Sequence, residues 1–148
     1  MTGERVAGGL DHRTPVAYCF GALWIPDSGG SVLESVENLL KATERTTIAT
    51  GVLNLWMHDP AQVAAAYAEL REAHADRFLL GIGVSHAAVV DASLEPGRYR
   101  KPLAAMRTYL DDLDAAPAQV PSDHRVLAAI GPKMLALSAE RAGGRIPI

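Results

Sequence analysis

The sequence predicts an α/β fold in which parallel strands alternate with helices. Four short apolar runs, rich in β-branched residues, are each followed by a segment whose apolar residues recur at helical spacing. Strands that are almost continuously apolar are typical of a parallel sheet covered by helices. The chain has 148 residues, 49% of them hydrophobic, which is enough for one domain with its own core.

The four strands are expected at residues 21–26, 47–55, 78–84 and 126–130. Gly51 lies within the second of them, where a glycine indicates a bulge or a close backbone approach. Residues 145–148 could begin one more strand. A complete (β/α)8 barrel usually needs about 200 residues or more. Periodicity alone therefore leaves open whether the sheet is open or part of a barrel.

The expected helices carry recognisable start signals. Ser31 is followed three residues later by Glu34, the spacing of a capping box. Asp59 is a good N-cap, with Pro60 at the first helical position. Residues 85–98 are expected to form a long loop. Two further helices are expected to begin at Pro102 and Pro132, and the second of these to end at a glycine cap formed by Gly143 and Gly144.

Composition and the N-terminus limit the class of protein. Residues 1–19 have no periodicity and are expected to be an irregular segment before a domain of residues 20–148. Cys19 is the only cysteine, which excludes an internal disulfide and fits a reducing compartment. The net charge is −3 without a basic stripe, so no nucleic-acid partner is expected. The apolar run 16–25 is too short to span a bilayer. We expect a cytoplasmic protein without a membrane partner.

Candidate functional residues follow from the strand positions, because ligands of parallel α/β proteins bind beyond the carboxyl ends of the strands. Asp27 follows the first strand and could orient a ligand or cap the loop. Asn54 lies on an apolar strand, and a buried amide there needs partners from the backbone or from a ligand. His58 could contact a ligand or help to cap a helix. His86, beside Ser85, could transfer a proton near neutral pH or be a hydrogen-bonded loop residue.

The pair Gly81-x-Gly83 is a weak nucleotide signal. A dinucleotide fingerprint needs a third glycine and a helix directly after it, whereas His86 occupies the third position here. An open doubly wound nucleotide-binding domain is therefore disfavoured. The alternatives are tight strand packing or backbone approach to a flat ligand. No metal site is expected, because the histidines show no ligand spacing and the cysteine stands alone.

The stretch from His58 to His86 resembles the signature of the luciferase-like monooxygenase superfamily. Its counterparts here are His58 with Pro60, Arg77, and Leu80-Gly81-x-Gly83. The runs GALWIPD and ATGVLNLW resemble the second and third strands of that family's barrel. The resemblance covers roughly residues 20–143. Within the superfamily, the sequence is most similar to a branch that uses the deazaflavin coenzyme F-420. It implies a partial TIM (β/α)8 barrel containing about strands two to five.

The resemblance also implies an activity and a site. It implies an oxidoreductase that transfers hydride with coenzyme F-420, or alternatively FMN, on a small-molecule substrate. His86 matches a position where some relatives carry an acidic proton donor, so it is the implied catalytic residue. The family often has a non-prolyl cis peptide at the bond that matches Gly51–Val52. The implied cofactor-binding residues are Asp27, Gly51, Val52, Asn54, Gly83 and Ser85.

A second hypothesis is a non-catalytic relative that self-associates. An incomplete barrel has two open strand edges and an uncovered apolar face. Association of copies would bury both, so a homo-oligomer is expected under either hypothesis.

Overall fold

The computed structural model describes residues 22–28 and 30–146, in which strands and helices alternate as the sequence predicts. The strands are β1 (Ala22–Ile25), β2 (Thr47–Thr50), β3 (Leu53–Asn54), β4 (Phe78–Gly83), β5 (Arg125–Ala128) and β6 (Gly144–Ile146). The helices are α1 (Val32–Ala42), α2 (Pro60–His74), α3 (Ala87–Ser93), α4 (Pro102–Ala115) and α5 (Pro132–Arg141), with a short 3-10 helix, η2 (Ser122–His124), before β5. The segment 1–19, which was expected to be irregular, lies outside the described residues.

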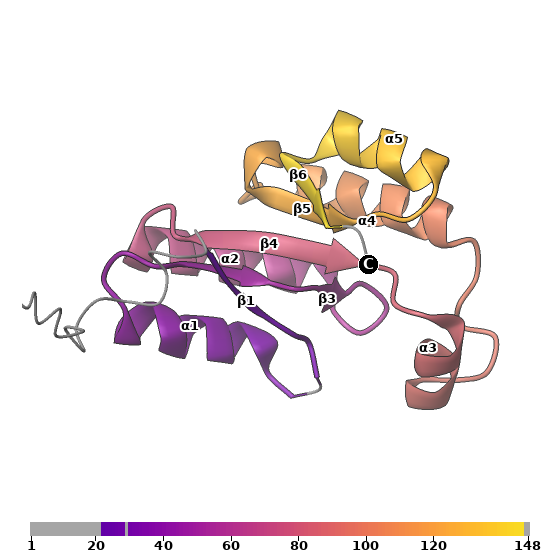
Figure 1. Cartoon of the computed structure of the whole chain (residues 1–148), viewed down its shortest axis with the longest axis horizontal. Helices are drawn as coiled ribbons and strands as arrows, with labels where there is room; N and C mark the ends of the chain where they lie inside the picture. Colours follow the sequence, from indigo (N-terminus) through magenta and orange to yellow (C-terminus); the bar gives the residue numbers. More distant parts are fainter. Residues whose placement is uncertain (1–21, 29, 147–148) are drawn as a thin grey trace, which may run out of the picture.

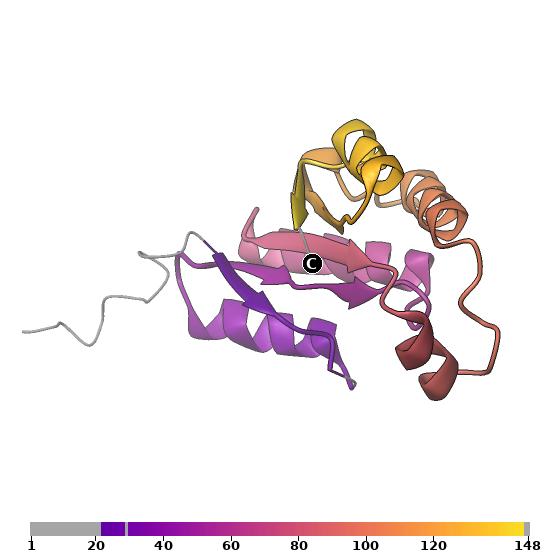
Figure 2. The same ribbon diagram turned by 45° about the vertical axis from the view of Figure 1, so that its right-hand side comes forward.

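The described strands form one sheet in which every recorded pair is parallel, as predicted. Their order is β1-β2-β4-β5-β6, and β3 pairs with β4. The sheet is curved, and α1, α2, α4 and α5 lie along its outer side (Figures 1 and 2). A curved wall of parallel strands with helices outside is part of a (β/α)8 barrel. The predicted fold class is therefore confirmed.

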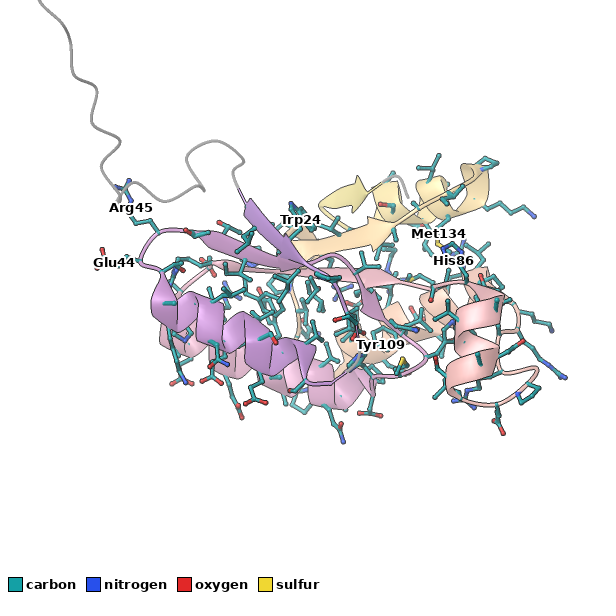
Figure 3. All side chains as sticks on the ribbon, turned by 60° about the horizontal axis from the view of Figure 1, so that its bottom comes forward. Trp24, Glu44, Arg45, His86, Tyr109 and Met134 are labelled. Atoms are coloured by element: carbon teal, nitrogen blue, oxygen red, sulfur yellow. The ribbon has the colours of Figure 1, made fainter. Side chains whose placement is uncertain are left out.

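The core fills the space between the sheet and the outer helices. Side chains alternate along each strand, so one set faces the helices and the other set faces the concave side. Trp24 lies on the face of the sheet turned away from α1 (Figure 3). The helix-facing set is buried and includes Ile48, Phe78, Leu80, Ile82 and Leu127. The strands are thus anchored from outside, which leaves the concave side and the strand ends available for a ligand.

The second strand, expected as one run over 47–55, is interrupted at Gly51, where the sequence indicated a bulge or a close backbone approach. β2 ends at Thr50, and β3 begins only at Leu53. The Gly51–Val52 peptide between them is cis. The Thr50 hydroxyl accepts from the Gly81 N–H and donates to the Gly81 carbonyl, each at 2.8 Å. This hydroxyl therefore satisfies backbone groups of β4 where the strand is broken.

Two predicted helix caps have different outcomes. Asp59 caps α2 as predicted, because its side chain accepts from the Gln62 N–H at 3.0 Å. Ser31 precedes α1, but the capping box is wrong, since its side chain makes no capping hydrogen bond. The Ser31 carbonyl instead accepts from the N–H of Ser35 at 3.1 Å and from its hydroxyl at 3.3 Å.

Two further expectations are corrected. The loop expected at 85–98 contains α3, a helix of seven residues that buries Val90. It was missed because so short a helix has too few turns to show an apolar period. The glycine cap expected after α5 is also wrong, since the helix ends at Arg141 and extended backbone follows. Gly143 has a packing role instead, because a Cβ there would lie 2.7 Å from the Asp123 carbonyl oxygen.

A charged side chain is buried at the start of β5. The Arg125 guanidinium donates to the Val120 carbonyl at 2.9 and 2.6 Å and also to the Asp114 carboxylate. Arg141 donates to the same carboxylate at 2.7 Å. Burial is the largest single influence on the pKa of Asp114 and raises it. The hydrogen bonds and the positive charges of the two arginines together outweigh burial and hold that pKa below its usual value.

Two buried tyrosines differ in how their hydroxyls are satisfied. The Tyr67 hydroxyl lies 2.5 Å from Nδ1 of His124. The Tyr109 hydroxyl is buried without a hydrogen-bond partner among the described residues. Burial raises the pKa of both phenols, and for Tyr109 the negative charge of Asp59 raises it further.

Candidate functional site

The candidate site is the edge of the sheet where the parallel strands end. Asp27 follows β1, Asn54 ends β3, and His86 follows β4. Figure 3 shows His86 at the end of the sheet opposite Glu44 and Arg45, which precede β2. The topology therefore places the predicted site residues at one edge, where parallel α/β proteins bind ligands.

A buried carboxylate connects two of these strand ends. Asp27 Oδ2 accepts from the backbone N–H of Asn54 at 3.0 Å. The same oxygen lies 2.7 Å from Nε2 of His58. The Asp27 side chain is 3% exposed, whereas the His58 side chain is 20% exposed. The carboxylate is thus held inside the edge, and the imidazole reaches its surface.

The side chain of Asn54 is only half satisfied by the protein. Its Oδ1 accepts from the backbone N–H of Trp56 at 3.1 Å, so the backbone supplies one of the partners that a buried amide needs. Its Nδ2 has no hydrogen-bond acceptor among the described residues. The Trp56 indole donates to the Val84 carbonyl at 2.8 Å and packs against the Tyr99 ring, with the ring centres 5.6 Å apart.

The cis peptide lies next to the glycines of β4. A Cβ on Gly83 would lie 2.5 Å from Val52 Cγ2 and 3.2 Å from the Ala128 Cβ. A Cβ on Gly81 would lie 1.8 Å from the Thr50 carbonyl oxygen. Of the alternatives for these glycines, the contacts favour tight strand packing. Because Val52 fills the space beside Gly83, any ligand would meet the Val52 side chain at this point.

Ser85 and His86 form the turn that leads from β4 into α3. Ser85 has a φ of +55°, in the left-handed region that few side chains adopt. The His86 carbonyl accepts from the N–H groups of Val89 and Val90, both at 3.0 Å. The His86 side chain is exposed and makes no hydrogen bond with the described residues. The turn therefore holds the backbone of His86 and leaves its imidazole free.

These residues fit a flat ring with a polar edge. Gly51 is exposed and has no side chain, and the half-buried Val52 adds an apolar surface beside it. Asn54 is 7% exposed as a residue, and its Nδ2 is a donor without a partner among the described residues. Apolar contact and a few converging polar groups are what binding sites for small molecules combine. In the described ranges, no group of three or more potential metal-ligating side chains comes together.

Sequence reasoning selected Asp27, Asn54 and His86, and it named His58 only as a weaker candidate. It missed the pairing of His58 with Asp27, which joins residues 31 positions apart. It also missed Trp56 and Tyr99, whose contact depends on the turn after β3 and the segment after α3. Of these contacts, the sequence indicated only that His58, next to the N-cap Asp59, could contact a ligand or help to cap the helix.

Comparisons with known proteins are consistent with this geometry. A protein-family model described as luciferase-like monooxygenase matches residues 17–148. A search of curated proteins found no match. In the described part of the chain, no helix is long and apolar enough to cross a membrane.

Proposed function

Since this chain belongs to the luciferase-like monooxygenase family, we propose that it binds a flavin-type cofactor at the carboxyl edge of its sheet, beside Gly51 and Val52. The family is one of oxidoreductases whose members generally use such cofactors. The cofactor proposed here is coenzyme F-420, or alternatively FMN, and the second substrate is a small molecule. When bound, the cofactor would supply the hydride chemistry, while the protein orients it and controls the proton.

The observation that carries the proposal is the partly satisfied polar edge beside the broken strand. Asp27 holds the backbone of Asn54, and Asn54 in turn holds the N–H of Trp56. These bonds fix the amide of Asn54 and leave its Nδ2 without a partner among the described residues. A donor that the protein leaves without a partner is available to a ligand that supplies the acceptor. Carbonyl groups on a flavin or deazaflavin ring are suitable acceptors.

The remaining site residues have distinct proposed roles. Ser85 would allow the backbone to approach the cofactor, whereas Gly83 would contribute indirectly, by letting Val52 pack against β4 and present its side chain to the cofactor. His86 would transfer a proton to or from the substrate, since its imidazole follows β4 and is exposed. No described group orients this imidazole, so its position would be set by the bound substrate.

The proposal is tested by titrating the protein with F-420 and with FMN, following cofactor fluorescence. Asn54→Ala should weaken binding about tenfold, because it removes one hydrogen bond to the ring. Asn38→Ala is the matched control, since Asn38 is exposed on α1. Both variants should be compared at temperatures where thermal melts show them folded. Equal affinity of the two variants, or no binding of either cofactor, would contradict the proposal.

A second candidate function is self-association without turnover, and a surface observation favours it. β1 and β6 each have one neighbour in the described sheet. Leu23 and Trp24 of β1 are 44% and 41% exposed. An exposed apolar edge strand is a template for pairing with another chain. We therefore propose that a second copy covers this edge, whether or not the protein is catalytic.

Light scattering after size-exclusion chromatography tests the association. The wild type should have the mass of an oligomer at micromolar concentration, and Leu23→Lys should shift it toward monomer because a charge on an edge strand opposes pairing. Leu94→Lys is the control, since Leu94 is equally exposed but lies beyond α3. A monodisperse wild-type monomer would rule the association out.

A further inference from the structure

The pair formed by His58 and Asp27 has the geometry of an oriented proton acceptor. A carboxylate oxygen can only accept a hydrogen bond, so the 2.7 Å contact requires a proton on His58 Nε2. In the neutral ring the other nitrogen then carries a lone pair. Nδ1 has no hydrogen-bond partner among the described residues. The contact with Asp27 therefore fixes which ring nitrogen accepts.

The carboxylate is itself held in place. Asp27 Oδ2 accepts from the Asn54 N–H at 3.0 Å, and the Asp27 side chain is almost completely buried. A base that is oriented by a fixed third group is the arrangement expected of a positioned acid–base residue. His86 differs, because its ring has no orienting partner among the described residues.

We propose that His58 accepts a hydrogen bond at Nδ1 from an N–H of the cofactor ring bound at this edge, with Asp27 as the residue that positions it. This inference rests on the proposed cofactor site and extends it to a residue that is not among the cofactor-binding residues implied by the family resemblance. The ring atom in question is an imide N–H, which flavins and deazaflavins both carry. The imide N–H would donate to His58 Nδ1, and a neighbouring ring carbonyl would accept from Asn54 Nδ2. The two side chains would thus recognise a donor and an adjacent acceptor of the ring.

The variant His58→Gln separates this role from a purely structural one. The Gln amide can still donate to Asp27, but it has no nitrogen lone pair at the position of Nδ1. If His58 only joins two loops, His58→Gln should bind FMN and F-420 as the wild type does. If His58 accepts from the cofactor ring as proposed, His58→Gln loses that hydrogen bond and should bind the cofactors about tenfold more weakly. FMN methylated at the imide nitrogen should bind the wild type about tenfold more weakly than FMN, and it should bind His58→Gln no more weakly than FMN does.

Nitrogen NMR of the histidine side chains gives a readout that does not depend on affinity. In the free protein His58 should be the Nε2–H tautomer, and Asp27→Asn should reduce that preference, whereas Asp112→Asn, an exposed control on α4, should not. FMN should shift the Nδ1 signal of His58. The signal of His74 is the internal reference. His74 is the last residue of α2, about 21 Å from Pro60 at the start of that helix, at 1.5 Å per residue.

The possible results separate the two ideas. Cofactor binding with an unchanged His58 signal, or with wild-type affinity in His58→Gln, would overturn the role of His58 and leave the proposed cofactor site standing. Failure of both cofactors to bind would overturn the cofactor site and the role of His58 with it. A mixed or Nδ1–H tautomer in the free protein would refute the positioning by Asp27.

Discussion

Gly83 allows a quantitative test of how closely β3 and β4 pack at the candidate site. In Gly83→Ala, the new methyl would lie 2.5 Å from Val52 Cγ2, whereas carbon atoms in ordinary contact are about 3.5–4.0 Å apart. An overlap of more than about 1 Å forces Val52 or the strand to move, and overpacking of this kind typically costs about 1–3 kcal/mol. The methyl also lies 3.2 Å from the Ala128 Cβ, which limits relaxation on the other side.

Val52→Ala should rescue this variant, because it removes the atom that the new methyl strikes. The double variant should be more stable than the sum of the single changes predicts, with a coupling free energy of about 1 kcal/mol or more. Gly81→Ala should have no such rescue, since its methyl would meet the Thr50 backbone carbonyl at 1.8 Å. Urea unfolding followed by tryptophan fluorescence measures these free energies. Wild-type stability of Gly83→Ala, or strict additivity with Val52→Ala, would refute the packing argument.

Three further predictions concern single side chains. Tyr67→Phe should lower the free energy of unfolding by about 1 kcal/mol. Tyr109→Phe removes a buried hydroxyl that has no partner among the described residues, so it should be neutral or stabilising in the same urea assay. Because the folded pKa of Asp114 is lowered, its contribution to stability is complete above its unfolded pKa of about 3.9 and is lost as the pH falls through the folded value. Asp114→Asn should therefore flatten the loss of stability below about pH 4, and an unchanged acid profile would contradict this. His86→Ala should lower the rate about 10²–10⁴-fold with little change in cofactor affinity, and wild-type turnover per folded molecule would exclude His86 from catalysis.

The sequence predicted the parallel strands from their apolar runs, which in β2, β4 and β5 are buried on both faces and therefore give a continuous signal. It also predicted the Asp59 cap, because Asp is a preferred N-cap residue and Pro60 is suited to the first helical position that follows it. The Ser31 cap failed for the converse reason: the spacing of a capping box does not fix the backbone angles that the box needs. Ser31 has a ψ of 84°, and its hydroxyl does not reach an N–H group of α1.

The candidate site was predictable only in part, because its decisive contacts join distant segments. Each strand end could be located from the pattern, so Asp27, Asn54 and His86 could be assigned to one edge. Which of these side chains is held and which is free depends on the turns between elements. The turn after β3 brings His58 back onto Asp27, while the turn after β4 leaves His86 in solvent.

This difference between the two histidines has a mechanistic consequence. An exposed imidazole without an orienting group can exchange protons with water as readily as with a substrate, whereas an imidazole fixed by a buried carboxylate presents one nitrogen in one direction. The edge thus contains one histidine that a carboxylate orients, and one exposed histidine without an orienting partner among the described residues. An oriented acceptor suits recognition of a ring that must be held still, and an exposed imidazole suits a substrate whose protons move. Cofactor binding should therefore depend on His58, and proton transfer should depend on His86.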